Sequence, residues 1–366
     1  MEQLRIPGPT PLHEDVIKAM TKQMINHRGV EFGNILSDAT ADLKAIFQTR
    51  NDVFLLTSSG TGGLEAAIVN TLSPGDKVLS VSVGVFGDRF AKIAQRYGAK
   101  VIPLNFEWGK AADPDAVRQV LKADPEITTV LVTHNETSTG ITNDLATISA
   151  IVKEFDKLLL VDAISSLGSI NLPVDEWHCD VVVTGSQKGW MVPPGLAMVS
   201  VSEASWRASE KAKMPRFYWD FGSARKYAGM DPTQTPWTPA VTTVYALGAA
   251  LKLLRQEGLT NIFTRHARIG KFTRQEVKSL GLNLFADESH ASNTVTSITT
   301  PDGVDAKKLL KILREEHQVV LAGGQAKLGG KIFRIGHLGL VTEADITQVT
   351  STLKVALPQA GFKSTG

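Results

Sequence analysis

A lysine just past a predicted buried strand is the first residue whose position suggests chemistry. Lys188 stands in the motif GSQKGW (185–190), directly after the apolar run DVVVT (180–184). A lysine in such a place can have a lowered pKa and form a Schiff base with a carbonyl compound. The alternative is a surface lysine whose stem covers apolar groups while its ammonium reaches water, and the motif by itself does not overturn that interpretation.

A carboxylate occupies a comparable place at the end of another apolar run. Asp162 closes the run LLLVD (158–162), and the segment AISSLG (163–168) that follows suits a tight loop around a ligand. Burying a lone carboxylate is costly, so we expect Asp162 to have a cationic partner. Taken singly, a helix cap or a structural salt bridge is the simpler interpretation.

A loop of small residues separates a third apolar run from a helix-length segment. The motif TSSGTGGLE (57–65) could place backbone N–H groups and a helix N-terminus around a phosphate. A tight strand–helix turn with a Ser or Thr cap is equally consistent with it. A dinucleotide loop is disfavoured because the full G-x-G-x-x-G is absent and no acidic residue ends the next predicted strand, 78–83.

The order of the three motifs is more specific than any one of them. A phosphate loop, a strand-end aspartate and a strand-end lysine, in that order, are what pyridoxal phosphate requires. The loop anchors the phosphate, the aspartate keeps the pyridine nitrogen protonated, and the lysine carries the aldehyde as an imine. The sequence therefore predicts pyridoxal 5'-phosphate as the cofactor.

Several motifs together make the chain similar to a known family. They are PGPT (7–10), SSGTGGLEAA (58–67), THNETSTG (133–140), VDAISSLG (161–168), GSQKGW (185–190) and FRIGHLG (333–339). With them the chain resembles the class V (fold-type I) pyridoxal-phosphate aminotransferases, particularly the alanine–glyoxylate / serine–pyruvate aminotransferase group. The likeness covers nearly the whole chain.

The resemblance implies roles for individual residues around the cofactor. Lys188 would form the Schiff base and later move the substrate's Cα proton as general base, and Asp162 would pair with the ring nitrogen. Phe86 would stack on the ring where many relatives have Trp, and Thr137 would donate to the 3-oxygen. The phosphate would be bound by Ser59, Gly60, Thr61 and Gln187.

The resemblance also implies a substrate contact and a shared site. Arg334 would bind the substrate α-carboxylate with two parallel hydrogen bonds, although an edge-strand arginine kept for solubility is the alternative. Gly8 would let the N-terminal backbone approach the same carboxylate. Thr235 and Thr238, in QTPWTPAV (234–241), would reach the partner's cofactor phosphate in a homodimer, unless this segment is only a rigid proline turn. The family often has Tyr where Thr235 stands.

Two residues keep open roles, and two kinds of site are disfavoured. His134 could line the site or be a satisfied loop histidine, and Arg28 could contact a substrate side chain or end a helix at the surface. The eight histidines include no H-x-x-x-H spacing, so we predict no metal site. Cys179, the single cysteine, precedes the strand that leads to Lys188, whereas a desulfurase needs a thiol on a mobile loop in the C-terminal half.

The elements that must position these residues follow from the apolar runs. Six short runs alternate with helix-length segments between about residues 50 and 200: 53–56, 78–83, 101–104, 128–133, 158–162 and 180–184. Such a pattern is typical of an α/β fold with a mostly parallel sheet covered by helices on both faces. A proline- and tryptophan-rich segment, 213–239, should be a long ordered excursion. We predict a large cofactor-binding domain (16–255) and a smaller α+β domain (256–366, with 1–15).

Composition limits the class of protein. The chain has 366 residues, 43% of them hydrophobic and 21% charged, which is ordinary for a globular protein. A net charge of +2 gives no footprint for nucleic acid or for an anionic membrane surface. No apolar run approaches the roughly 18 residues of a membrane span, and the N-terminus lacks a signal-peptide core. A cytoplasmic enzyme is expected.

The expected activity is a transamination. The chain should move an amino group from a small amino acid, alanine or serine, to a 2-oxo acid, glyoxylate or pyruvate. Aspartate or another donor is an alternative if Arg28 or another cation enters the site. A lyase or desulfurase with the same cofactor is a weaker alternative, and so is a catalytically retired partner subunit, because Lys188, Asp162 and Arg334 are all present.

Overall fold

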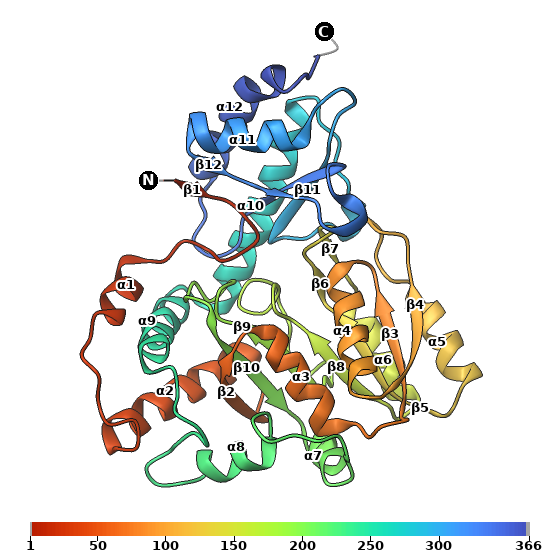
Figure 1. Ribbon diagram of the computed structural model, residues 1–366, viewed down its shortest axis with the longest axis vertical. Coiled ribbons are helices and arrows are strands. Elements are labelled where there is room, and N and C mark those ends of the chain that lie inside the picture. Colours follow the sequence, from red (N-terminus) through yellow and green to blue (C-terminus); the bar gives the residue numbers. More distant parts are fainter. Residues whose placement is uncertain (1, 364–366) are drawn as a thin grey trace.

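A seven-stranded sheet forms the centre of the computed structural model, which describes residues 2–363 (Figure 1). The order is β2–β10–β9–β8–β5–β3–β4, and β10 alone runs antiparallel to its neighbours in this sheet. The bounds are β2 Asp52–Ser58, β10 Gly195–Val201, β9 Val181–Gly185, β8 Leu158–Asp162, β5 Ile127–Thr133, β3 Lys77–Ser82 and β4 Lys100–Asn105. The mostly parallel sheet expected from the apolar runs is confirmed, but β10 is not among the six predicted runs and was missed.

Helices cover both faces of this sheet because each strand sends alternate side chains to opposite sides. Val130 and Val132 of β5 join one hydrophobic core and Leu131 joins the other. The first core includes residues of α2 (Val30–Phe47), α5 (Pro114–Ala123), α6 (Leu145–Glu154) and α9 (Val241–Glu257). The second includes residues of α3 (Gly60–Thr71), α4 (Val85–Arg96), α7 (Glu203–Ser209) and α8 (Phe221–Ala228). Helix α1 (Glu14–Met20) packs on α9.

A second, smaller body holds the C-terminal third of the chain and lies at the top of Figure 1. Its antiparallel sheet has the order β11–β14–β13, and a core of its own joins this sheet to three helices. The bounds are β11 Val295–Thr299, β13 Ala322–Gly323, β14 Ile332–Gly336, α10 Leu259–Ser279, α11 Ala306–His317 and α12 Glu343–Gln359. The N-terminal strand β1 (Gln3–Leu4) pairs in parallel with β12 (Val319–Val320). The domain limits 16–255 and 256–366 stay a prediction.

Short elements complete the chain. They are β6 (Asn135–Glu136), which pairs with β7 (Ile141–Thr142), and the 3-10 turns Glu288–His290 and Ala326–Leu328. The proline-rich segment is ordered, and it contains helix α8, which its irregular composition does not predict. That helix begins because Asp220 accepts a hydrogen bond from the Ser223 amide (2.6 Å) and because Phe221 is buried in the second core.

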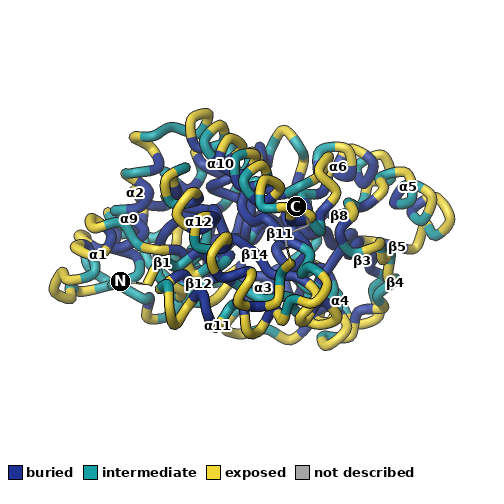
Figure 2. The backbone as a smooth tube through the Cα atoms, turned by 90° about the horizontal axis from the view of Figure 1, so that it is seen from above, coloured by how far each residue is buried: buried dark blue, intermediate teal, exposed yellow. Residues whose placement is uncertain are grey.

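Burial follows the sheet and its covering helices. Figure 2 shows the buried backbone along the middle of the molecule and the exposed backbone on the outer turns of the helices. Among residues 2–363, no helix combines the length and the apolar character that crossing a bilayer requires.

Candidate active site

The strands β2, β5, β8 and β9 all end on the same side of the sheet, which we call its carboxyl edge. The predicted site residues follow these strand ends. Thr133 pairs with Asp162 across β5 and β8, and Asp162 pairs with Val183 on β9. Lys188 comes three residues after β9 ends. In open α/β sheets, ligands bind at this edge. The structure therefore brings the aspartate and the lysine to the same side of the sheet.

Asp162 is a buried carboxylate with a strongly shifted titration. Its side chain is 3% exposed, and Oδ1 accepts a hydrogen bond from the Ile164 amide (3.0 Å). Burial raises the pKa of Asp162 to about 7, and the negative charge of Glu136 acts in the same direction. The positive charges of Arg89 and Lys188 act in the opposite direction. A cation placed beside this carboxylate would favour its ionised form.

Lys188 is partly buried, and its titration is shifted toward neutral pH. Its Nζ donates to the carbonyl oxygen of Pro7. Burial lowers the pKa of Lys188 to about 8; the positive charges of Arg334 and Arg89 also lower it, while Asp162 raises it. An amine with such a pKa is partly neutral near pH 8, and a neutral amine is the nucleophilic form.

Gly8 lies directly against this lysine. A Cβ at position 8 would come 2.6 Å from Cδ and 2.7 Å from Nζ of Lys188, and the backbone at Gly8 has φ +112°. A residue with a side chain would therefore be strained and would displace the amine. The N-terminal backbone thus contacts Lys188, and the role of Gly8 toward a substrate carboxylate stays a prediction.

The start of α3 forms a cradle of backbone amides. Ser59 precedes the helix in an extended conformation and makes no side-chain cap, and Gly60 and Thr61 begin the first turn. The first amides of a helix have no intrahelical acceptor. A Cβ on Gly60 would come 2.5 Å from Ile164, so the loop after Asp162 packs against this cradle.

The Gln187 side chain completes this cradle. Its Oε1 is buried without a hydrogen-bond partner. A Cβ at Gly185 would lie 3.1 Å from this oxygen and 3.5 Å from the Gly60 nitrogen, so the side-chain amide and the helix start share one place. The first amides of α3 are donors and fit a phosphate, which accepts hydrogen bonds. The orphaned Oε1 is itself an acceptor, so the atom of the Gln187 side chain that could donate to a phosphate here is Nε2. The residues present therefore fit the phosphate end of pyridoxal phosphate.

Thr137 and Phe86 approach the same edge from two neighbouring elements. Thr137 is buried, and its hydroxyl donates to Ser165 Oγ (2.7 Å), which in turn donates to the Asn135 carbonyl (2.9 Å). Phe86 is the second residue of α4 and is half-buried. The guanidinium of Arg89 stands 4.8 Å from the centre of the Phe86 ring.

Arg334 is a buried cation that bonds to neutral groups. It is 5% exposed, on β14, and its guanidinium donates to the Gly323 carbonyl (2.7 and 3.1 Å), the Thr137 carbonyl (3.0 Å) and Gln325 Oε1 (3.4 Å). Burial lowers the pKa of Arg334 to about 10, and the charge of Glu136 opposes this. A buried guanidinium whose own bonds are to neutral groups is suited to bind an anion.

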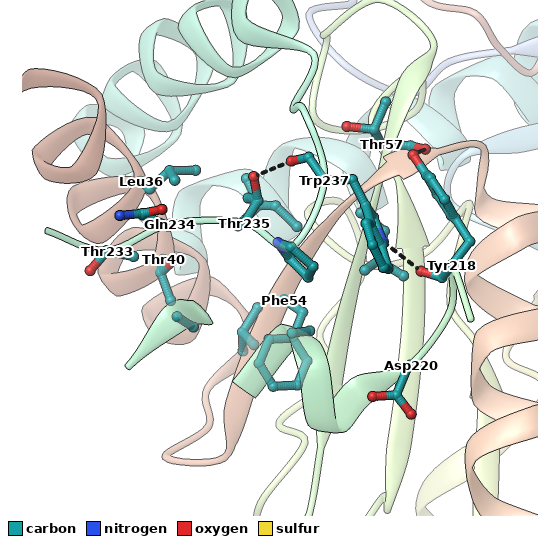
Figure 3. A pocket seen from close by; sticks show the side chains of 16 residues that line it. Leu36, Thr40, Phe54, Thr57, Tyr218, Asp220, Thr233, Gln234, Thr235 and Trp237 are labelled. Atoms are coloured by element: carbon teal, nitrogen blue, oxygen red, sulfur yellow. Dashed lines mark hydrogen bonds between the residues drawn. The ribbon is translucent and has the colours of Figure 1, made fainter. Parts of the chain in front are cut away.

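The loop with Thr235 and Thr238 lies against the edge strand β2. Thr235 donates to the Trp237 carbonyl (2.7 Å), and Thr238 is exposed. Figure 3 shows the small pocket between this loop and β2, with Trp237 donating to the Tyr218 carbonyl (2.9 Å). Within the described chain, the hydroxyl of Thr235 is thus engaged in its own loop rather than with the residues around Lys188.

Arg28 and His134 contact other parts of the protein framework rather than the residues around Lys188. Arg28 donates to the Thr235 carbonyl (2.5 Å) and to Gln234 Oε1 (3.0 Å), so it holds the loop. His134 is buried edge-on against Trp177, with ring centres 6.0 Å apart, and burial lowers its pKa to about 4. Residues 2–363 include no group of three or more His, Cys, Asp or Glu that could hold a metal ion.

Three residues of the site are missing from the sequence-based prediction. Glu136 accepts hydrogen bonds from the first amides of α4, Arg89 stands over Phe86, and Ser165 bonds to Thr137. Glu136 and Ser165 lie inside the motifs THNETSTG and VDAISSLG. The carboxylate of Glu136 within a run of small polar residues could have indicated a buried contact. The helix amide that it binds, that of Gly87, is 49 residues away in the sequence and could not be identified from the motif.

Comparison with known proteins is consistent with this geometry. The family model described as aminotransferase class-V matches residues 4–336. The chain is 45% identical to the soluble hydrogenase 42 kDa subunit of Anabaena cylindrica, over 99% of this chain and 94% of that protein. It is 39% identical to an L-aspartate–glyoxylate aminotransferase of Paracoccus denitrificans (98% and 91% covered) and 38% identical to a serine–glyoxylate aminotransferase of Methylorubrum extorquens (99% and 92%). The structure of an alanine–glyoxylate aminotransferase from Nostoc superimposes with a TM-score of 0.93 at 31% identity, covering 97% of this chain and 95% of that one.

Proposed function

The chain belongs to the class V aminotransferase family, and on that premise we propose that it moves an amino group from alanine or serine to glyoxylate or pyruvate. Its class is that of the pyridoxal-phosphate-dependent aminotransferases, which act on amino acids and 2-oxo acids. The observation that carries the proposal is that Asp162 and Lys188 follow the neighbouring strands β8 and β9, while Arg334 of the small sheet donates to the carbonyl group of Thr137, which lies at the same end of the large sheet.

The residues of this chain that would hold the cofactor can be named. When bound, pyridoxal phosphate supplies an aldehyde that takes the amino group and a cationic ring that accepts electrons. Asp162 would hold the proton on the ring nitrogen, and Phe86 would lie on the ring face. Thr137, whose hydroxyl donates to Ser165 in this structure, would turn that hydrogen to the ring oxygen. The phosphate would rest on Ser59, Gly60, Thr61 and Gln187.

Lys188 would attach to the cofactor through its amine and act as the general base. Its lowered pKa means that little free energy is needed to deprotonate it near pH 8. Gly8 leaves room for the amine to move between these tasks, since a Cβ there would contact Nζ. Lys188 would take the proton from the substrate Cα.

Arg334 would bind the α-carboxylate that every amino-acid and 2-oxo-acid substrate carries. It is already oriented by the carbonyl groups of Gly323 and Thr137, so little side-chain entropy is lost on binding. A carboxylate would supply the counter-charge that its bonds to neutral groups do not provide.

Aspartate is the second candidate donor, and one observation favours it. A side-chain carboxylate needs another cation, and Arg28 is committed to the loop at Thr235. Arg89, however, stands over Phe86 and acts on the titration of both Asp162 and Lys188. The name of the Paracoccus relative points to the same donor. The hydrogenase in the name of the Anabaena relative has no counterpart among these observations.

We also propose a homodimer in which Thr238 and Thr235 reach the partner's phosphate site. The exposure of Thr238 and the position of its loop at the sheet edge support this. A cytoplasmic location stays a prediction.

A half-reaction screen tests the proposal. Protein loaded with pyridoxal phosphate is mixed with alanine, serine or aspartate, and the loss of visible absorbance is followed together with the 2-oxo acid released. We expect alanine or serine to react fastest, and Lys188→Ala to show no visible band while the exposed control Lys252→Ala behaves like the wild type. A wild-type protein that takes up no cofactor would contradict the proposal, and faster conversion with aspartate would replace the donor.

A further inference from the structure

Glu136 is a fully buried carboxylate in the site to which the proposed chemistry assigns no task. Its relative exposure is 0%, and it lies on β6, one residue before Thr137. Residues with proposed roles surround it: the Phe86 amide donates to it, Thr137 follows it in the chain, and Arg334 donates to the Thr137 carbonyl. A buried charge requires compensation, so the contacts of Glu136 show what it stabilises.

The carboxylate of Glu136 binds the start of helix α4. Its Oε2 accepts hydrogen bonds from the amides of Phe86 and Gly87, each with a length of 3.0 Å. Its Oε1 accepts from the Ser138 amide (3.1 Å) and from the Ser138 hydroxyl. Phe86 and Gly87 are the second and third residues of α4, where helix amides lack intrahelical acceptors. The contact thus joins β6, which ends directly before Thr137, to the helix that carries Phe86.

This helix has no cap of its own. Its N-cap residue is Gly84, which has no side chain, and a Cβ there would come 2.5 Å from both Cγ and Cδ of Glu136. The backbone at Gly84 is extended (φ 173°), a conformation open to any residue. Glycine at position 84 therefore makes room for the carboxylate of Glu136, which caps the helix from another element.

The donors around Glu136 match its ionised form. Each oxygen faces N–H or O–H donors, and a protonated carboxyl would direct its own hydrogen at one of them. The helix N-terminus adds a favourable partial positive charge. Burial raises the pKa of Glu136, and the four hydrogen bonds oppose this.

We propose that Glu136 is a positioning residue whose carboxylate fixes the first turn of α4, with the Phe86 ring, against the cofactor site and places a second negative charge beside Asp162. The inference rests on the proposed function. The effect of Glu136 on its neighbours agrees with it, since its charge raises the pKa of both Asp162 and Arg334. The other charges that act on Asp162 are those of Arg89 and Lys188.

Two substitutions distinguish the effect of where the Glu136 carboxylate lies from the effect of its negative charge. Glu136→Gln keeps the size but removes the charge and leaves one oxygen acceptor. Gly84→Ala keeps the charge near its place, but the new Cβ, 2.5 Å from Cγ and Cδ of Glu136 and from Ser138 Oγ, would shift the carboxylate off the α4 amides. We expect both variants to speed hydrogen exchange at the Phe86 and Gly87 amides of the cofactor-free protein, and both to weaken cofactor binding about tenfold.

Of the two variants, only Glu136→Gln, which loses the charge, should change the pH midpoint of the cofactor's visible absorbance. A negative charge beside the cofactor favours its protonated form, so Glu136→Gln should lower the pH midpoint of the visible absorbance change by about half a unit to one unit. Gly84→Ala should leave this midpoint within about a fifth of a unit of the wild type, a difference well below that expected for a lost charge. Asp113→Asn, the same carboxylate-to-amide change at the N-cap of α5, is the matched control and should change neither binding nor midpoint.

The results for the two variants and for the wild type each support or contradict the role of Glu136 in a different way. A Glu136→Gln protein that is less stable to heat but has wild-type amide exchange, cofactor affinity and midpoint would overturn the proposal, because Glu136 would then be merely structural. If that variant fails to fold, exchange and affinity in Gly84→Ala decide the question. If the wild type binds no cofactor, the proposed function fails, and amide exchange in the cofactor-free protein still tests the cap.

Discussion

Arg334 Nη1 donates a hydrogen bond of 3.0 Å to the carbonyl oxygen of Thr137, a residue 197 positions away in the sequence. Arg334 belongs to the small sheet of the C-terminal body, and Thr137 follows the large sheet. The group proposed to bind the substrate carboxylate is therefore fixed by the same segment that would contact the cofactor ring. This hydrogen bond joins the residue proposed to bind the substrate to the residue proposed to bind the cofactor.

Arg334→Lys should weaken substrate binding far more than cofactor binding. A lysine keeps the charge but loses the planar pair of donors and cannot bond to Gly323 and Thr137 at once. We expect KM for the amino acid to rise about 10- to 100-fold, with kcat reduced less. Steady-state kinetics checks this, with the exposed Arg314→Lys as control. Equal loss of cofactor affinity and substrate affinity would contradict the assignment.

The Lys188 amine should react at unusually low pH in the cofactor-free protein. Because burial and Arg334 lower its pKa to about 8, the neutral form dominates above that value. Competitive labelling with an amine reagent, read by peptide mass spectrometry, should give a midpoint near pH 8, against about 10.4 for the reference compound Nα-acetyl-lysine. A midpoint matching the reference compound would mean that the amine is solvated.

Gly8→Ala should impair loading of the cofactor. The new Cβ would come 2.6 Å from Cδ and 2.7 Å from Nζ of Lys188, and the φ of +112° is unfavourable for alanine. Gly75→Ala is the matched control, because Gly75 has a similar φ of +92° but nothing within 4 Å of a Cβ. Both variants should lose about 1–2 kcal/mol of stability, and only Gly8→Ala should lose cofactor affinity. Comparable loading of the two proteins would argue against a close approach of Gly8.

Mixing two inactive variants should restore activity if the site is shared between subunits. Thr238→Glu would repel the partner's phosphate, and Lys188→Ala lacks the amine. A heterodimer of the two has one intact site, so an equimolar mixture after subunit exchange should recover about a quarter of wild-type activity. Activity assays before and after exchange measure this. A Thr238→Glu protein with full activity would contradict the shared site.

Acid should destabilise the protein through a buried histidine of the C-terminal body. His266 is buried with Nδ1 2.8 Å from the Ile262 carbonyl, and burial lowers its pKa to about 4. The unfolded state takes up a proton below about pH 6.5 and the folded state only near pH 4, so stability is full above 6.5 and falls between these values. His266→Leu should reduce the pH slope of the unfolding free energy by up to about 1.4 kcal/mol per unit. Denaturant titrations at several pH values test this, and an unchanged slope would contradict it.

The sequence by itself determined the α/β class, six of the seven strands of the large sheet and the linear order of Ser59–Thr61, Asp162 and Lys188. It did not predict β10, the one antiparallel strand of that sheet. The features that it determined follow from local patterns, since apolar runs define parallel strands and polar residues at their ends must meet at one edge of the sheet. The family motifs then implied the cofactor and Arg334. Each of these inferences needed only a short stretch of chain.

The tertiary structure alone decided which residues meet across the fold. Helix α8 formed inside the proline-rich segment because Phe221 finds a core to enter. Arg28 went to the Thr235 loop, and Glu136 became the cap of a helix 49 residues earlier. The spacing of residues in one motif does not specify such long-range contacts, because they depend on how the helices and strands pack. For the same reason, no sequence pattern could show that one hydrogen bond joins Arg334 to Thr137.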